Sequence, residues 1–295
     1  MAAATAPGTS DGERPPATSS RSGILRPEEF SRYATLTRTA PGPDVALWVE
    51  WYWSVTWDLP EGASYVSAVV PHPALHLTVE WGERGAGRRH GVTMPAALLH
   101  GIVNSRFDIR LEGVGGVAGV KFRPGGFGAF TGRDVATTLG SVVALAEFFG
   151  PAADALRDSV IRADVDSRHD LLEAFLRNRA PGPDPRYDQV LTIVADMLSD
   201  RSLTRVEDVT ERHGIPLRTL QRLFRRYVGV GPKWALQRYR LHDAVTLIDA
   251  GEVDDLAGLA ASLGWYDQAH FTREFTALVG MPPARYAAQP APQAR

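Results

Sequence analysis

Residues 217–229, LRTLQRLFRRYVG, combine two different faces in one short stretch. At about 100° per residue, the large apolar side chains fall together on one side of a helix: Leu220, Leu223, Phe224 and Tyr227. Three arginines fall on the other side, with Gln221 beside them: Arg218, Arg222 and Arg225. The stretch therefore predicts a helix that packs on one side and presents positive charge on the other.

A short helix and a tight turn precede this stretch. The segment VEDVTERHGI, residues 206–215, places Val206 and Val209 on one helical face, and Gly214 supplies the turn. Pro216 suits the first turn of the following helix, where a backbone N–H has no helical partner in any case. Two helices joined by a short turn that contains glycine have the spacing of a helix-turn-helix motif.

Charge is strongly segregated in this part of the 295-residue chain, although the formal net charge is only −2. From Arg212 to Arg240 there are eight Arg and Lys residues and no acid, whereas Leu241 to Asp267 holds six acids and no Arg or Lys. Arginine matches phosphate with its forked guanidinium and reads guanine through O6 and N7. An arginine-rich helix face is usually only solvated. Together with the helix-turn-helix spacing, however, this charge indicates nucleic-acid binding.

The helical unit occurs twice. A shift of 51 positions aligns six residues of the first copy with the second: Leu220 with Phe271, Arg222 with Arg273, Phe224 with Phe275, Val228 with Val279, Gly229 with Gly280 and Pro232 with Pro283. The segment between the copies, Pro232 to Asp249, predicts a helix of about 27 Å at 1.5 Å per residue. Successive major-groove faces of DNA are about 34 Å apart, so a helix of this length suits the spacing of two DNA-reading units.

The region from about residue 187 to 288 resembles the tandem helix-turn-helix domain of AraC/XylS-type transcription regulators. The motifs that carry the resemblance are LQRLF in the first unit, GWYDQAHFTREF in the second, and GMPPARY at the end. The resemblance implies that two recognition helices enter adjacent major-groove segments on one face of double-stranded DNA. The base-facing positions that it implies are Arg218, Gln221, Arg222, Gln268, Ala269, Thr272 and Arg273.

Several residues of this region have a less specific interpretation. At the base-facing position Ala269 the side chain forms no hydrogen bond and can only contact a thymine methyl. We therefore expect the second unit to discriminate less between base sequences. Arg225 and Arg226 are expected to contact phosphate, because most protein–DNA hydrogen bonds go to the backbone. Trp234 and Trp265 are expected to pack in cores.

The N-terminal half alternates apolar and polar residues with the period of two that is typical of strands. The segment VEWYWSVTW places Val49, Trp51, Trp53, Val55 and Trp57 on one face. LHLTVEW places Leu75, Leu77, Val79 and Trp81 against His76, Thr78 and Glu80, and FDIRLEG points Phe107, Ile109 and Leu111 inward. Amphipathic helical patterns follow between residues 141 and 178.

We therefore expect an α+β multidomain protein. It should have a β-sandwich or barrel of cupin-like shape with one filled interior and trailing helices over residues 23–178, a proline-rich linker at 179–186, and an all-α tandem helix-turn-helix domain at 187–288. Residues 1–22 and 289–295 are predicted to be disordered tails. The order WYW, PHPALHLTVEWG, KFRPGGFGAF resembles a module of unknown function found ahead of such DNA-binding domains, which implies a sensory or dimerising role.

The sequence gives little sign of a catalytic or metal site. His72, His76, His90 and His100 are the candidate ligands, but Pro73 interrupts the first pair and no glutamate partner or dense His-x-His spacing stands out. No nucleophile elbow, phosphate loop or dinucleotide fingerprint occurs, and RPGGFG reads as a turn. There is no cysteine. We predict no metal, no cofactor and no enzymatic activity.

The tryptophans of the strand region allow two interpretations. Trp48, Trp51, Trp53, Trp57 and Trp81 either fill the core, which we favour, or line an apolar pocket for a small effector.

The sequence as a whole predicts a cytoplasmic, sequence-specific transcription regulator. Its expected partners are double-stranded DNA, RNA polymerase, a small-molecule effector and a second copy of the chain held through the helices at 141–178. No apolar run approaches the roughly 18 residues of a membrane span. Two alternatives stay open: a metal-binding cupin-like enzyme with an appended DNA-binding domain, and a protein–protein interaction module.

Overall fold

The computed structural model describes residues 15, 17–18, 23–83, 87–103 and 106–288. The two predicted tails, 1–22 and 289–295, lie almost entirely outside these residues. Thr18 is described and fully buried. Its backbone N–H donates to Glu50 Oε1 at 3.2 Å, and its carbonyl accepts a hydrogen bond from the Tyr239 hydroxyl at 2.9 Å. Thr18 thus links the strand region to the helical region.

The N-terminal half is built on one six-stranded antiparallel sheet in the order β1-β2-β9-β4-β7-β10. The bounds of its strands are β1 Thr35–Thr39, β2 Val49–Asp58, β9 Val114–Phe122, β4 His76–Glu83, β7 Ala96–His100 and β10 Val142–Ala144. Two antiparallel pairs complete the strands: β3 Ser64–Val69 with β8 Phe107–Glu112, and β5 Arg88–Arg89 with β6 Val92–Thr93. A short helix, α1 Pro27–Phe30, precedes the sheet.

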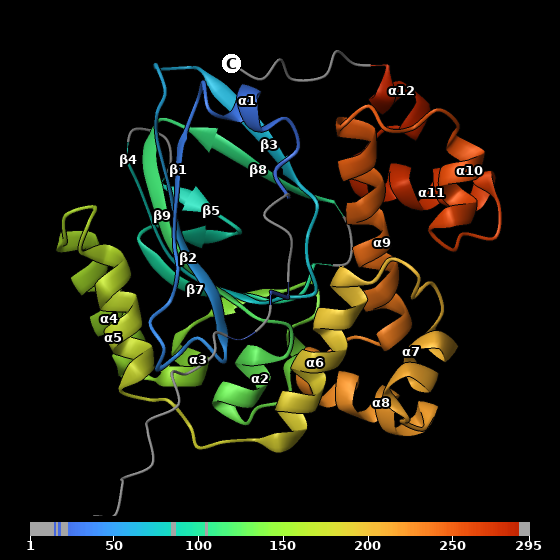
Figure 1. Cartoon of the computed structure of the whole chain (residues 1–295). Coiled ribbons are helices and arrows are strands. Elements are labelled where there is room, and N and C mark those ends of the chain that lie inside the picture. The colour runs from blue at the N-terminus through green and yellow to red at the C-terminus, as the bar shows by residue number, and fades with distance from the viewer. Residues whose placement is uncertain (1–14, 16, 19–22, 84–86, 104–105, 289–295) are drawn as a thin grey trace, which may run out of the picture.

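Helices cover one face of the sheet. The helices α4 Pro151–Arg162 and α5 Arg168–Arg177 lie along it (Figure 1), and their apolar residues join the core formed by Leu77, Val79 and Val120. His169 of α5 fixes this packing, because its Nε2 lies 2.8 Å from Ser54 Oγ. The helices predicted between residues 141 and 178 thus use their apolar faces on the sheet.

The expectation of one filled interior is wrong, because the sheet buries both faces. Leu77 and Val79 of β4 point toward the helices, whereas Thr78 and Glu80 of the same strand line a cavity on the other face. Val49 also leaves the predicted row, since a register irregularity between Val49 and Trp51 changes which side chains share a face.

The segment after the sheet differs from the predicted helix. Val142 lies in β10, which pairs with β7, and only Ala146–Phe149 forms the short helix α3. Edge pairing with β7 satisfies backbone groups that a helix would otherwise have satisfied internally.

The C-terminal half consists of helices, as predicted. Their bounds are α6 Pro185–Ser199, α7 Val206–His213, α8 Leu217–Leu223, α9 Pro232–Asp249, α10 Leu256–Ser262, α11 Gln268–Val279 and α12 Pro283–Ala287. Helix α6 begins inside the predicted linker, capped by Asp184. The predicted bounds of α9 are confirmed. One turn of π-helix at Phe224–Val228 follows α8 and was not predicted.

The glycine motif RPGGFG lets the two halves pack closely. It forms the turn into α2, Gly126–Thr131, which lies beside α6 (Figure 1). A Cβ on Gly125 would lie 3.1 Å from Tyr227 Cβ, and one on Gly128 would lie 2.8 Å from the Tyr227 carbonyl oxygen. One hydrophobic core therefore continues from the sheet into the first helix-turn-helix unit.

Candidate nucleic-acid interface and ligand cavity

The first helix-turn-helix unit is formed by α7 and α8. Gly214 joins them with φ 58°, a left-handed conformation that glycine adopts readily. Leu220, Phe224 and Val228 are fully buried, and their packing holds α8 and the turn after it against the core. The predicted base-facing residues Arg218, Gln221 and Arg222 are all exposed on the other side.

The second unit, α10 and α11, repeats this arrangement. Phe271 and Phe275 are fully buried, and Val279 is 1% exposed. Gln268, Ala269 and Arg273 are exposed and Thr272 is partly exposed. Trp265 is buried and its Nε1 donates to Glu274 Oε2 at 2.7 Å, which confirms its expected packing role.

Tyr266 is a surface residue that the sequence did not single out. It directly precedes α11 and is 93% exposed, although it is a large aromatic side chain. Its place in the motif GWYDQ, beside a recognition helix, is the signal that could have found it.

The positive charge between Arg212 and Arg240 is less uniform than the sequence indicated. Arg212 forms an ion pair with Asp200 at 2.6 Å, and the buried Arg240 forms one with Asp243 at 2.9 Å. Arg238 is also buried, where its guanidinium lies 4.4 Å from the Trp234 ring centroid. The acids that compensate these charges lie outside the segment in sequence and beside it in space.

Two neighbouring arginines after α8 have different surroundings. Arg225 and Arg226 are both exposed. The Arg226 guanidinium donates to the carbonyl oxygens of Gly132 at 2.8 Å and Arg133 at 2.9 Å, both in the N-terminal half. The guanidinium of Arg226 is thus part of the junction between the halves.

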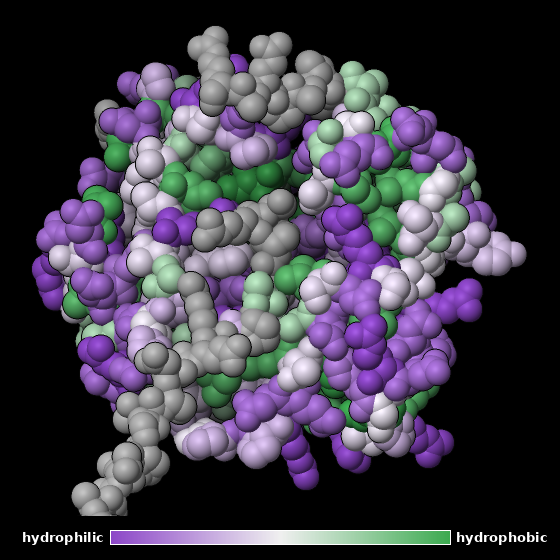
Figure 2. All heavy atoms as spheres, viewed as in Figure 1, coloured by the Kyte–Doolittle hydropathy of each residue, from purple (hydrophilic) through white to green (hydrophobic). Residues whose placement is uncertain are grey.

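The N-terminal half encloses a cavity of about 190 Å³ between the six-stranded sheet and the β3–β8 pair. Trp51, Trp53 and Trp57 line it, so these three form a pocket wall. Trp48 packs against Phe130 instead, and Trp81 lies against Arg168. In Figure 2 hydrophobic side chains gather in a recess over β8, whose residues Phe107, Ile109 and Leu111 point inward as predicted but line the cavity.

Small residues on β9 make room for the tryptophans. Gly119 pairs with Trp53 across the strands and Gly115 with Trp57. A Cβ on Gly119 would lie 2.6 Å from the Trp53 ring, and one on Gly115 would lie 2.5 Å from the Trp57 ring. The glycines thus let the indoles lie close to the sheet.

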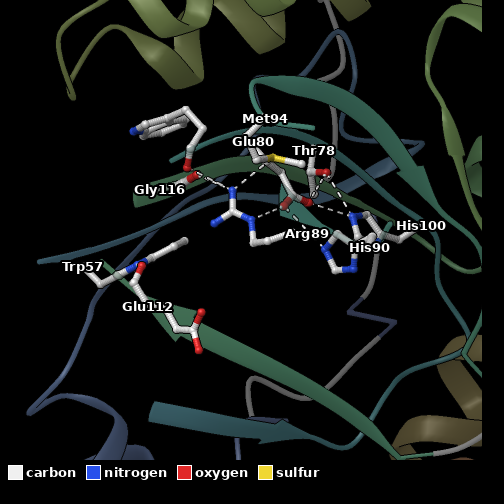
Figure 3. A network of polar contacts seen from close by, with 10 residues as sticks. Trp57, Thr78, Glu80, Arg89, His90, Met94, His100, Glu112 and Gly116 are labelled. Carbon is white, nitrogen blue, oxygen red and sulfur yellow. Dashed lines mark hydrogen bonds and ion pairs between the residues drawn. The ribbon is translucent and has the colours of Figure 1, made fainter. Parts of the chain in front are cut away.

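A buried polar network closes one side of the cavity (Figure 3). Glu80 Oε1 accepts hydrogen bonds from Thr78 Oγ1 at 2.9 Å and lies 2.9 Å from His100 Nε2. Its Oε2 lies 3.2 Å from Arg89 Nε and 3.5 Å from His90 Nε2. Burial alone would raise the pKa of Glu80, but the hydrogen bonds from His100 and His90 and the charge of Arg89 lower it overall.

The expectation that the histidines lack a glutamate partner is wrong. Glu80, His90 and His100 have potential metal-ligating atoms that all lie within 4.8 Å of one another. The pairing was hidden in sequence because the turn between β5 and β6 and the end of β7 bring these residues together. Arg89 already neutralises the same carboxylate, so a metal ion here would face a neighbouring positive charge.

The other end of the cavity is basic. His72, His76 and Lys121 line it. Burial lowers the pKa of all three, to about 7 for Lys121 and well below the usual value for the histidines. His72 also stacks on His242 of α9, with ring centroids 3.9 Å apart. This end of the cavity therefore touches the helix that joins the two helix-turn-helix units.

Two family models match the chain. Residues 37–144 match a domain of unknown function (DUF6597), which spans the sheet and its cavity, and residues 209–289 match a helix-turn-helix domain of the AraC type. The chain thus carries an AraC-type helix-turn-helix domain behind a DUF6597 domain. It is a DNA-binding transcription regulator.

Several solved structures are similar to the chain at low sequence identity. ToxT from Vibrio cholerae has a TM-score of 0.40 at 12% identity, covering 80% of this chain and 96% of that chain. A structure of ToxT with an unsaturated fatty acid bound has a TM-score of 0.36 at 12% identity, covering 90% and 95%. No curated protein matches the chain. Among the described residues, no helix is long and apolar enough to cross a membrane.

Proposed function

We propose that this regulator reads two adjacent major-groove segments with α8 and α11, under the control of a small molecule bound in the N-terminal cavity. One observation carries the DNA-reading part. The two units bury the same positions of the repeat and leave polar residues exposed on the opposite side of each recognition helix. A helix of 18 residues, α9, separates them.

We assign the contacts to DNA bases from which side chains of the recognition helices are exposed. Arg218, Gln221 and Arg222 face outward on α8, and among the described residues none of them takes part in an ion pair. Arginine and glutamine make bidentate contacts to guanine and adenine. On α11 the corresponding positions are Ala269, Thr272 and Arg273, with Gln268 beside them, and Ala269 provides only an apolar contact.

Phosphate contacts should supply most of the affinity. Arg225 is exposed beside α8 and suits this role. Arg226 was predicted to share it, but its hydrogen bonds to Gly132 and Arg133 compete with a phosphate contact. We therefore assign Arg225 to phosphate and Arg226 to the junction with the N-terminal half.

Control by an effector follows from the way the halves are joined. The hydrophobic core runs from the sheet through Phe127 and Val135 to Phe224 and Val228 of the first unit. The cavity lies on the same sheet, and its residue His72 stacks on α9. A molecule that changes the packing around the cavity can thus change how the units sit, provided that it binds the two arrangements with different affinity.

A metal-dependent enzyme is the second candidate function, favoured by the cluster Glu80, His90 and His100. We infer that this cluster is structural and that the protein acts without catalysis. Both oxygens of Glu80 already have partners, and Arg89 holds one of them. Metal content of purified protein tests this. A stoichiometric metal lost in Glu80→Gln would support the enzyme instead.

The experiment that tests DNA reading is capture and sequencing of genome fragments by purified protein. The test variant is Arg218→Ala/Arg222→Ala. The matched control is Arg32→Ala/Arg162→Ala, which removes two exposed arginines from the N-terminal half. We expect a motif with two half-elements about one DNA turn apart, kept by the control and lost in the test variant. Equal capture by both variants would contradict the proposal.

Two further partners belong to this proposal. RNA polymerase is the expected target of a regulator bound near a promoter. A homodimer held through the helices at 141–178 would use the outer faces of α4 and α5, because their apolar faces already cover the sheet. Sedimentation velocity across a concentration series tests the dimer, and a monomer at every concentration would exclude it.

A further inference from the structure

Lys121 is a buried cation at the floor of the cavity. It is 3% exposed and lies on β9 directly between Trp51 of β2 and His76 of β4. Its Nζ lies 4.3 Å from the Trp51 ring centroid. Among the described residues, no carboxylate lies within ion-pair distance of it. It is one of only two lysines in a chain that otherwise uses arginine, the other being Lys233.

The charged groups around Lys121 do not neutralise its positive charge. Arg38 of β1 lies over the same indole, 5.5 Å from its centroid. The one acid whose charge acts on Lys121 is Glu50, which is bound to Arg123 at 3.3 Å. The titratable and charged groups around this end of the cavity are Arg38, Glu50, His72, His76, His100, Arg238 and His242. A buried charge without a partner is costly, so this position favours an anion.

Between Lys121 and the Glu80 network the walls of the cavity are apolar, and the space is small. Its walls are the indoles of Trp51, Trp53 and Trp57 and the β8 side chains Phe107 and Ile109. The volume is about 190 Å³. Since a cavity of about 150 Å³ accommodates benzene, this one has room for a single ring and a short acidic group.

We propose that the cavity binds a small aromatic monocarboxylate, with its carboxylate on Lys121 and its ring against Trp51 and Trp53. This rests on the proposed function, because it names the effector class of that cavity. One free cation matches one negative charge. A phosphate dianion would favour a second positive charge, but burial keeps His72 and His76 neutral, and the nearby Arg38 guanidinium lies over the Trp51 ring. A neutral ligand would leave Lys121 without a partner.

Binding of the acid should be linked to a proton. Burial lowers the pKa of Lys121 to about 7, so the empty cavity holds a largely neutral amine at pH 8. A carboxylate favours the charged ammonium, and Lys121 must take up a proton to bind it. The affinity for the acid should therefore fall about tenfold from pH 6 to pH 8, whereas the affinity for a neutral analogue should stay constant.

The bound anion would act on the helical domain through His72. This histidine lies at the basic end of the cavity and stacks on His242 of α9. Besides burial, the charges of His242, Lys121 and His76 hold its pKa low. An anion beside it offsets that repulsion and changes the contact with α9, which separates the two DNA-reading helices.

Isothermal titration of the full chain with phenylacetate and with phenylacetamide tests the proposal. These probes differ in charge and share size and ring. At pH 6 we expect the acid to bind wild type at least tenfold tighter than the amide. In Lys121→Met this preference should disappear while the amide binds within about threefold of wild type. The control Lys233→Met, which alters the other and exposed lysine, should behave as wild type.

The possible results separate this inference from the proposed function. A Lys121→Met variant that keeps the preference for the acid would overturn the inference, as would a wild type that binds neither probe. If that variant does not fold, the pH dependence of wild type decides, and an acid affinity that is constant from pH 6 to pH 8 contradicts the role of Lys121. Capture of DNA fragments is measured without either probe, so its failure would count against DNA reading alone.

Discussion

The two helix-turn-helix units keep the same buried positions and differ in their surroundings. Leu220 and Phe224 in the first unit correspond to Phe271 and Phe275 in the second, and all four are fully buried. The first unit shares a continuous core with the sheet domain, whereas the second has a separate core, which Val70 and Leu25 alone join from the part of the N-terminal half that the structure describes. The repeated sequence thus gives both units the same fold. The segments of the N-terminal half that pack on each unit determine which unit is coupled to the cavity.

This difference indicates a division of labour. The first unit carries the arginine-rich recognition helix and the contacts of Arg226 and Tyr227 with the N-terminal half. The second unit touches that half through fewer groups, including a hydrogen bond from Arg106 to the Val279 carbonyl at 3.1 Å. We expect effector signals to reach the first unit more directly than the second.

The largest expected effect breaks the junction of the first unit. In Gly128→Ala the new Cβ would lie 2.8 Å from the Tyr227 carbonyl oxygen of the first unit, so the variant should lose about 3 kcal/mol of unfolding free energy. Gly280→Ala, beside the second unit, should lose only about 1 kcal/mol, the cost of a left-handed residue at φ 86°. There the neighbouring atom belongs to the flexible Arg106 side chain, which can move. Urea unfolding compares them, and equal losses would contradict the proposed difference in coupling.

The second prediction compares the recognition helices. Arg222→Ala should weaken binding to the best DNA site by about 1–3 kcal/mol and relax one base position. Arg273→Ala should cost less, because the neighbouring Ala269 has no side-chain donor to hold the helix in register. Fluorescence anisotropy with single-base variants of the site measures both. Uniform weakening of every sequence would identify Arg222 as a phosphate contact instead.

The third prediction uses the histidines where α9 meets the cavity. Burial lowers the pKa of His242 to about 3 and holds that of His72 well below its usual value, so both are neutral in the folded protein. The unfolded chain binds protons as the pH falls below about 6.5, and stability is therefore lost in that direction. Each histidine should cost about 1 kcal/mol between pH 7 and pH 5.5.

Chemical denaturation at the two pH values measures this loss. His242→Gln should lose less stability than wild type over this interval. A His242→Gln variant with the full loss would show that the junction does not hold this histidine neutral.

The smallest expected effect distinguishes two adjacent arginines of the first unit. Arg225→Ala should reduce the slope of log affinity against log salt by about 1, because a phosphate contact is lost. Arg226→Ala should leave the slope unchanged and lower stability by less than about 1 kcal/mol, since it removes exposed hydrogen bonds to two carbonyl groups. A reduced slope in Arg226→Ala would show that Arg226 leaves the junction when DNA binds.

Local patterns predicted much of the DNA-binding half. The period of the apolar residues placed Leu220, Leu223 and Phe224 in a core, and the bounds of α9 followed from its proline and its composition. The π-helical turn at Phe224–Val228 escaped prediction, because its residues have the same apolar spacing as an α-helix over so short a stretch. The charge pattern was misleading where acids distant in sequence, such as Asp200, pair with arginines of the segment.

The cavity was the part that local patterns could not predict. Alternation along β2 and β4 identified two faces of each strand, but it did not reveal that Trp53 and Thr78 would line the same space. Nor could spacing bring Glu80 to His90 and His100. Those juxtapositions depend on strand order and register, which pair β4 with both β7 and β9.

The sequence by itself therefore determined most of the helices and strands, the duplicated helical unit and the residues that face away from its cores. Each of these depends on the period of nearby residues along one helix or strand. Only the tertiary structure decided that the Lys121 amine is buried against Trp51 and that Arg226 bonds to the N-terminal half. Whether a charge is buried or paired depends on which distant segments surround it, and the spacing of nearby residues carries no information about those segments.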